Sequence, residues 1–368
     1  MLRVAAVAVA VALAAAGCTG SPPAGSSVIA IDTNVDVCGG PWSAPHGGPT
    51  TFAVTNRYGA PMDVYLAGAA GGAVYQELEG IGTGATLNAT VTLGNGRYRF
   101  ECFPADGSAV LGPTVTIDAA SGVSGTTPAV RPVTPADLIP VAKAYQAWVV
   151  GRLPVLRRQI DALVADVAAG DPAKAKADWL TAHLTYETLG AAYDAFGDLD
   201  SAINGDLTGF HKIEALLWSG SPAPALQAAV AGLLHAVDQL ITQFATVDID
   251  PNIIALRAHE IVENAIQFEL NGTTDAGSHS NLATIGANLA GATETLNLLT
   301  PLLVSRYPKL ASAKAALTAA QRLVAGLGHA GLDTLTRAQR ENLNAELENL
   351  VELLAPIAAI CDERVASQ

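Results

Sequence analysis

The sequence predicts an all-β sandwich followed by an all-α helical bundle, and three observations support this fold class. Residues 28–119 contain short runs such as TFAVTN, MDVYLA and YRFECF, separated by Gly and Pro clusters. Alternating or β-branched runs of this kind predict about seven strands of a small sandwich. From Pro135 onward, apolar residues recur at steps of three and four, which is the period of amphipathic helices. Residues 120–134 have many turn formers and no apolar period, which predicts a linker.

The N-terminus predicts export and a lipid anchor. Arg3 supplies a positive charge, residues 4–16 are apolar, and small residues stand directly before Cys18. This arrangement is typical of a signal peptide, here residues 1–17, with Cys18 as the lipidated residue. Residues 18–27 then form a flexible tether. The apolar run is too short to span a bilayer, so we expect the mature chain to be anchored at the extracytoplasmic face of the cell membrane. Ordinary cleavage beside an incidental Cys is the alternative.

The helical domain is expected to occupy residues 135–368. Asp171 followed by Pro172 predicts an N-cap and a first helical residue, and Gly197 is expected to end the helix 173–196. Further helices are predicted at 209–218, 223–245, 252–270, 278–304, 308–327 and 334–365. The short connections between them favour an up-and-down bundle.

The composition excludes one class of partner. The formal net charge of −14 argues against nucleic acid, because that binding needs cationic contacts to phosphate. An acidic protein suits the collection of cations, but acidity also serves simple solubility.

Two neighbouring segments carry side chains that could bind a metal. On the helix 173–196, His183, Glu187 and Asp194 share a narrow stripe at 100° per residue. The stripe is either a solvated outer face or a site with a partner, because buried imidazole and carboxylate groups are costly without one. His211 and Glu214 follow at i, i+3 on the next helix, and can point a nitrogen and a carboxylate at one cation, as Glu-x-x-His pairs do in di-iron bundles.

The loop between these segments and a later helix add weaker candidates. Asp198 is expected in the intervening loop, and His259 shares a helix face with Glu263 at i, i+4. A structural role for His259 is an equal alternative. Mixed carboxylate and imidazole ligands suit iron, manganese or zinc. Neither HExxH nor HxxEH occurs in the sequence, so the usual helical zinc-peptidase motif is missing.

Three segments resemble the imelysin family, and its EfeO branch in particular. They are WLTAHLTYETLGAAYDAFGDLDSAI at 179–203, GFHKIEALLW at 209–218 and RAHEIVENAIQFELNG at 257–272. The family's HxxE motif corresponds to His211 and Glu214, which implies a metal site there, with Glu187 and Asp194 of the preceding helix directed toward it. Two departures are visible: Gly190 stands where some relatives carry a carboxylate, and the connection 204–208 is short.

The resemblance implies a function. An EfeO-like chain would be an extracytoplasmic iron-binding lipoprotein of an EfeUOB-type iron uptake system. It would capture Fe²⁺ or Fe³⁺, with zinc or copper as other possible ions, and pass iron to a membrane permease. A haem-dependent peroxidase is a further implied partner. The alternatives are a metallopeptidase, because imelysins were first described as peptidases, and a purely structural envelope protein.

The β-domain resembles the cupredoxin-like domain of longer EfeO proteins. A blue-copper centre needs two His and a Cys, and His46 is the only His before His183, so that centre is not expected here. Cys38 and Cys102 match the two Cys of that domain. Outside the cytosol they are expected to form a disulfide, and the alternative is a second metal or redox site with Glu101 or Asp63. Cys361 is expected to be a small buried residue.

Overall fold

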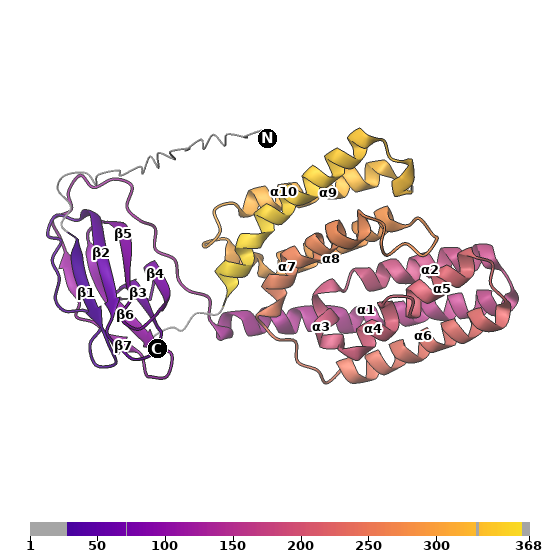
Figure 1. Cartoon of the computed structure of the whole chain (residues 1–368), viewed down its shortest axis with the longest axis horizontal. Helices are drawn as coiled ribbons and strands as arrows, with labels where there is room; N and C mark the ends of the chain where they lie inside the picture. Colours follow the sequence, from indigo (N-terminus) through magenta and orange to yellow (C-terminus); the bar gives the residue numbers. More distant parts are fainter. Residues whose placement is uncertain (1–27, 71, 329–330, 363–368) are drawn as a thin grey trace, which may run out of the picture. The chain divides into compact units, whose positions relative to one another are not determined.

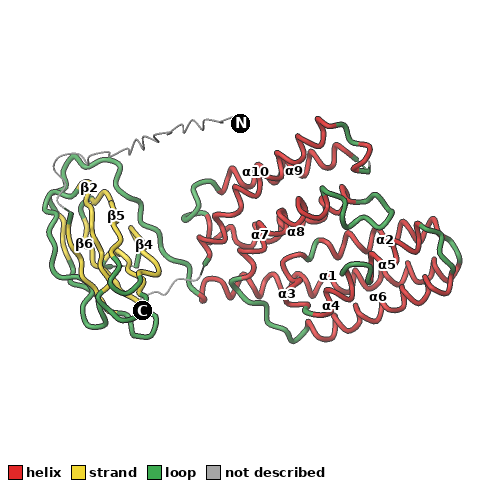
Figure 2. Tube along the Cα trace, viewed as in Figure 1, coloured by secondary structure: helices red, strands yellow, loops and turns green. Residues whose placement is uncertain are grey.

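A computed structural model describes residues 28–70, 72–328 and 331–362. The chain divides into two compact units, Met1–Ala129 and Val130–Gln368. The first is all-β and the second all-α, as Figures 1 and 2 show. The predicted fold class is therefore confirmed. The expected signal peptide, the tether and Cys18 lie outside the described residues.

The β unit consists of two sheets. The first has the order β1-β2-β5 and the second the order β4-β3-β6-β7, with β8 also paired to β6. The strands are β1 (Ile29–Thr33), β2 (Gly48–Asn56), β3 (Met62–Gly68), β4 (Val74–Ile81), β5 (Thr86–Leu93), β6 (Gly96–Pro104), β7 (Val110–Leu111) and β8 (Val115–Ile117). Strand β1 runs parallel to β2, whereas the other strand pairs are antiparallel.

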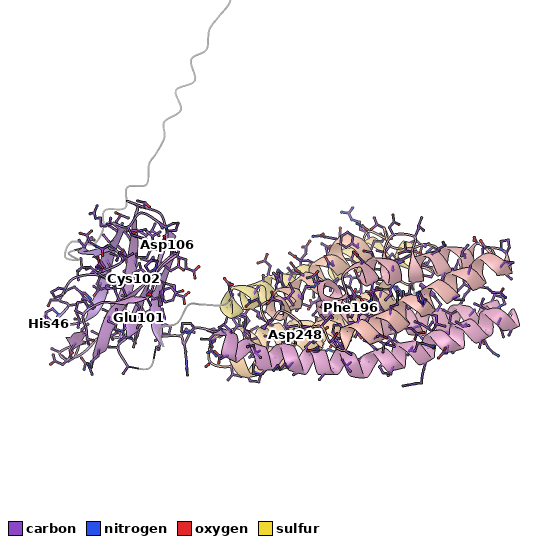
Figure 3. All side chains as sticks on the ribbon, turned by 90° about the horizontal axis from the view of Figure 1, so that it is seen from below. His46, Glu101, Cys102, Asp106, Phe196 and Asp248 are labelled. Carbon is purple, nitrogen blue, oxygen red and sulfur yellow. A yellow bond between two sulfur atoms is a disulfide. The ribbon has the colours of Figure 1, made fainter. Side chains whose placement is uncertain are left out.

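Aromatic rings and a disulfide occupy the interior of this unit. The Phe52 ring meets Trp42 and Phe100 edge to face, with ring centroids 5.0 and 5.1 Å apart. Cys38, which follows β1, forms a disulfide with Cys102 of β6, and their Cα atoms are 5.6 Å apart (Figure 3). The alternative of a thiolate metal site is thereby corrected, because both sulfur atoms are bonded to each other. Beside Cys102, the Glu101 carboxylate pairs with Arg99 at 2.7 Å.

The helical unit is built from long helices joined by short turns. Its helices are α1 (Pro135–Ala169), α2 (Pro172–Glu187), α3 (Tyr193–Phe196), α4 (Asp198–Asn204), α5 (Gly209–Trp218), α6 (Ala223–Phe244), α7 (Ile253–Asn264), α8 (Asn281–Leu303), α9 (Leu310–Leu327) and α10 (Arg337–Cys361). Helix α1 packs against α2 and α6, α7 packs against α8 and α10, and α9 packs against α8 and α10. Cys361 is a free, buried thiol, as expected.

Helix α6 is, among the described helices, the one long and apolar enough to cross a membrane by length and composition. One of its faces is buried in the core of the helical unit, through Val230, Leu233, Ala236, Val237, Leu240 and Phe244. In this structure α6 is therefore one of the helices of the bundle.

The predicted helix 173–196 is interrupted, which corrects the sequence interpretation. Helix α2 ends at Glu187, and the 3-10 turn η1 (Gly190–Ala192) and the short α3 follow. Contacts from other helices stabilise this interruption. The Arg257 guanidinium donates from Nε and Nη2 to the Gly190 carbonyl at 3.1 and 2.8 Å. Gly291 of α8 lies so close to the backbone of Thr188 that a Cβ on Gly291 would be 2.5 Å from the Thr188 carbonyl oxygen.

The segments on either side of this interruption also differ from expectation. Residues 198–204 were expected to form a loop and instead form helix α4. The expected linker 120–134 makes contacts in its middle and near its C-terminal end. Thr127 exchanges hydrogen bonds with Thr92 of β5, and Val133 is buried in the core of the helical unit.

Candidate metal centre

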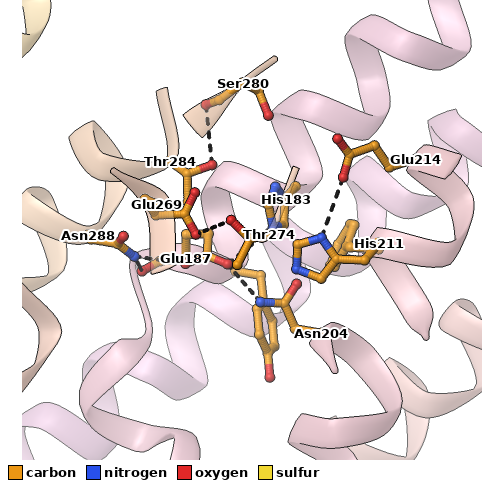
Figure 4. Close-up of polar contacts among 12 residues, drawn as sticks. His183, Glu187, Asn204, His211, Glu214, Glu269, Thr274, Ser280, Thr284 and Asn288 are labelled. Carbon is orange, nitrogen blue, oxygen red and sulfur yellow. Dashed lines mark hydrogen bonds and ion pairs between the residues drawn. The ribbon is translucent and has the colours of Figure 1, made fainter. Parts of the chain in front are cut away.

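A small cavity lies among helices of the all-α unit, with a volume of about 150 Å³. Polar side chains from several elements line it (Figure 4). The polar and charged ones include Glu187, Asn204, His211, Arg257, Glu269, Thr274 and Asn288. The cavity therefore brings together two carboxylates and an imidazole that lie far apart in the sequence.

Glu187 occupies the last turn of α2 and is held by two amides. Asn204 Nδ2 donates to Oε1 and Asn288 Nδ2 donates to Oε2, each at 2.7 Å. Burial alone raises the pKa of this carboxyl group, but His183, Asn288 and Asn204 together outweigh burial and hold the pKa below its ordinary value. Glu187 is therefore an ionised carboxylate fixed in place before any ion arrives.

His183, one turn before Glu187, is buried, and its Nδ1 makes no hydrogen bond within the described part of the chain. Its ring stacks on Trp179, with centroids 5.0 Å apart, and lies 5.4 Å from the ring of His211. Nε2 is 3.1 Å from Glu187 Oε1 and pairs with that carboxylate, the contact by which His183 lowers the pKa of Glu187. The ring lies beside Glu187 and His211 but does not itself line the cavity. Because buried polar atoms nearly always have partners, the unpaired Nδ1 makes His183 a candidate metal ligand.

His211 is brought to the cavity by an abrupt start of α5. Gly209 has a φ of +40°, and a Cβ at this position would lie 1.9 Å from the Ile203 carbonyl oxygen, so α5 can pack this closely only with glycine at its first residue. Trp179 Nε1 donates to the Phe210 carbonyl at 2.9 Å, which ties α5 to α2. Burial lowers the pKa of His211, but Glu214, Glu187 and Glu269 more than compensate, and the pKa is raised overall.

Glu214 lies beside His211 and is also nearly fully buried. Its Oε2 is 3.4 Å from His211 Nδ1, and its Oε1 accepts hydrogen bonds from the backbone amides of Ala276 and Ser278, at 3.1 and 2.9 Å. Burial raises the pKa of Glu214, whereas His211 and Ser278 lower it, and the net shift is downward. Glu214 is therefore an anion with partners on both oxygens.

Glu269 is the residue that sequence reasoning missed. It ends the π turn η2 (Ala265–Glu269) that follows α7, and it accepts from Thr274 Oγ1 and Asn281 Nδ2, each at 2.8 Å. Burial and the charge of Glu187 raise its pKa. A π turn changes the helical register, so the stripe through His259 and Glu263 did not identify Glu269. The available signal was that Glu269 lies within the segment 257–272 that resembles imelysins.

Three of the sequence candidates lie away from the cavity. The side chains of Asp194 and Asp198 are exposed, so Asp194 does not reach the interior as expected, because α2 ends before the stripe could continue. His259 lies 4.0 Å from Glu263 and does not line the cavity. Across residues 28–70, 72–328 and 331–362, no three His, Cys, Asp or Glu side chains stand close enough to hold an ion without moving.

These observations define the class of protein: a helical bundle with buried imidazole and carboxylate groups gathered at one cavity. Residues 141–357 match the sequence profile of the imelysin family, and the chain belongs to that family. The resemblance noted in the sequence is thereby confirmed.

The chain is also similar to proteins named iron uptake system component EfeO. It is 25% identical over 304 residues to the one from Yersinia pseudotuberculosis serotype I (strain IP32953), which covers 78% of this chain and 79% of the relative. It is 24% identical over 335 residues to the one from Escherichia coli (strain K12) and to the one from Shigella flexneri, covering 86% of each chain.

Proposed function

We propose that this chain is the extracytoplasmic iron-binding component of an iron uptake system, and that it captures iron at the cavity described above. The observation that carries the proposal is His183, a buried imidazole whose Nδ1 makes no hydrogen bond within the described residues. It stands beside the ionised Glu187 and within ring contact of His211. The names of the EfeO relatives favour iron as the ion.

The imidazole and carboxylate groups at this site suit iron. His183, His211, Glu187 and Glu269 would supply two imidazoles and two carboxylates, which is a combination favourable to Fe²⁺ and also acceptable to zinc. Each carboxylate keeps free lone pairs after accepting its hydrogen bonds. A bound cation would also relieve the repulsion between Glu187 and Glu269, which contributes to the raised pKa of Glu269. The ligands would close on the ion by small side-chain movements, and release would follow the reverse path.

The partners and the location belong to the same proposal. Iron would pass from this chain to a membrane permease, and the β unit, which we propose to be cupredoxin-like, would dock the permease or a haem-dependent peroxidase. Residues 1–17 would be removed on export, and Cys18 would carry the lipid that holds the chain at the cell membrane.

Metal titration of the mature Cys18→Ala protein tests the iron site. We expect His211→Ala and Glu187→Gln each to weaken Fe²⁺ binding at least ~100-fold, because each removes a ligand. Substitution of residues that only contact a ligand already lowers metal affinity about 10–100-fold. His235→Ala, on the exposed side of α6, is the matched control and should bind like the wild type. Isothermal titration under anaerobic conditions gives the affinities, and circular dichroism checks the fold. Wild-type affinity in both site variants would refute the proposal.

The metallopeptidase alternative gives a different result with the same proteins. A peptidase loaded with Zn²⁺ or Fe²⁺ would hydrolyse a mixture of unstructured peptides, and His211→Ala would abolish the hydrolysis. An iron-capture protein would leave the peptides intact while still binding the ion. Mass spectrometry of the peptide mixture separates the two functions.

The anchor is tested by cell fractionation. Two acyl chains on Cys18 should hold the protein at the membrane stably, so Cys18→Ala should move it from the membrane fraction to the soluble envelope fraction or the medium. Ser21→Ala, in the same tether, should leave the distribution unchanged. Retention of the Cys18→Ala protein in the membrane fraction would show that the anchor is elsewhere.

A further inference from the structure

We infer that Glu214 does not bind the ion itself but positions the residues that do: His211 by direct contact, and Glu269 through a loop. The inference rests on the proposed metal-binding function. It assigns the two residues of the HxxE motif to different tasks, although their spacing alone predicts two equivalent ligands.

Both carboxylate oxygens of Glu214 already have partners within the protein. Oε1 accepts two backbone amides and Oε2 faces His211 Nδ1. The side chain is 2% exposed and does not line the cavity that His211, Glu187 and Glu269 share. In Figure 4 it lies on the other side of the His211 ring from Glu187 and Glu269. Glu187 and Glu269 also accept hydrogen bonds on both oxygens, but they line the cavity, whereas Glu214 would have to leave its amide donors to reach an ion there.

The two ring nitrogens of His211 differ in their surroundings, because Nδ1 faces the Glu214 carboxylate. A carboxylate facing Nδ1 favours the tautomer with the proton on that atom, which leaves the lone pair of Nε2 for an ion. The distance of 3.4 Å between Nδ1 and Oε2 is at the long end for a hydrogen bond, but the two side chains are only 12% and 2% exposed, so solvent screens their attraction little. A carboxylate behind a ligating histidine is a common arrangement at metal sites, where it orients the ring and increases its basicity.

Glu214 also binds the loop that orients Glu269. The amides that it binds belong to Ala276 and Ser278. The same connection carries Thr274, and Asn281 begins α8 directly after it; these two side chains donate to the two oxygens of Glu269. One buried carboxylate therefore links α5 to the segment that sets the position of a second carboxylate at the cavity.

Glu214→Gln tests the inference, because glutamine has the same shape but cannot accept on both atoms. We expect Fe²⁺ affinity to fall about 10–100-fold, as for other residues behind metal ligands. The ligands themselves should remain. Infrared difference spectra of the Co²⁺-bound minus the metal-free protein should show the same carboxylate bands in wild type and Glu214→Gln. In Glu187→Gln, one pair of carboxylate bands should disappear.

Glu214→Asp is the second variant, in case glutamine disturbs folding. It keeps the negative charge behind His211, so its affinity should lie between those of wild type and Glu214→Gln with an unchanged set of bands. Loss of a carboxylate band pair in either Glu214 variant would overturn the inference and make Glu214 a ligand. If the wild-type protein binds neither Fe²⁺ nor Co²⁺, the proposed function fails first, and this outcome is distinguishable because it precedes any variant.

Discussion

Glu269 combines, in a single residue at the cavity, a cost to stability with a proposed role in metal binding. Its carboxylate is buried near the negative Glu187, and both features raise its pKa. A carboxyl group with a raised pKa stabilises the fold fully only below its unfolded pKa, which is near 4.3. This contribution is lost as the pH rises through the folded pKa. At higher pH, burial and the charge of Glu187 therefore make Glu269 unfavourable to the stability of the metal-free protein.

Removing the charge of Glu269 should make the metal-free protein more stable and its Fe²⁺ binding weaker. We expect Glu269→Gln to raise the melting temperature of the metal-free helical unit at pH 7, because glutamine carries no charge and can accept from Asn281 while donating to the Thr274 hydroxyl oxygen. The gain should vanish toward pH 4, where Glu269 is protonated, and Fe²⁺ affinity should fall at all pH values. Calorimetry in the presence of a chelator measures the first effect. Glu263→Gln, exposed on α7, is the control, and a lower melting temperature for Glu269→Gln at pH 7 would contradict this account.

At the scale of elements, the site depends on where α2 stops. Its end at Glu187 is set by neighbours: Arg257 of α7 binds the Gly190 carbonyl, and Gly291 of α8 rests on the backbone of Thr188. Asn288, one turn earlier on α8, holds Glu187. The position of α8 against the end of α2 therefore determines where the Glu187 carboxylate points.

Two alanine substitutions on α8 test this dependence. In Gly291→Ala the new Cβ would lie 2.5 Å from the Thr188 oxygen, so α8 must move, at a cost of about 1–3 kcal/mol in the free energy of unfolding. Metal affinity should fall as well. In Gly286→Ala the nearest atom, on Val324, is 3.6 Å away, and the higher helix propensity of alanine should stabilise the fold by about 0.5–1 kcal/mol. Chemical denaturation measures the free energy of unfolding of both variants. Similar changes in Gly291→Ala and Gly286→Ala would mean that the close contact between Gly291 and Thr188 does not matter for stability.

At the scale of the whole molecule, the two units should respond separately to reduction. Cys38 and Cys102 are 64 residues apart in sequence, and a crosslink closing a loop of that length stabilises by roughly 4 kcal/mol in the chain-entropy model. That is a large fraction of the stability expected of a small domain. The helical unit has Cys361 as its single Cys and should be insensitive to reductant.

Cys38→Ser with Cys102→Ser should therefore lower the unfolding midpoint of the β unit while leaving that of the helical unit in place. Near-UV circular dichroism and calorimetry on the Cys18→Ala protein can follow the two transitions. Thiol titration of the unfolded Cys18→Ala protein should find one thiol before reduction, from Cys361, and three after it. Three thiols before reduction would show that the disulfide does not form in the cell envelope.

Much of the fold was predictable because it depends on local periodicity. The switch from strand runs to helical spacing, the Asp171-Pro172 helix start and the bounds of α5 follow from short-range preferences that the sequence carries directly. So does the proximity of His211 to Glu214, since residues at i, i+3 share a helix face. Glu187 and His183 were found for the same reason, as they lie one turn apart on α2.

The tertiary structure decided which of these residues meet. Asp194 was excluded because contacts from α7 and α8 interrupt the helix that would have aligned it with Glu187. Glu269 was included because a π turn and the connection after it aim a distant carboxylate at the cavity. The difference in task between His211 and Glu214 depends on two backbone amides more than 60 residues further along the chain. Local sequence determines the faces of helices, whereas the donors that occupy a buried carboxylate come from other elements and are set only when the chain packs.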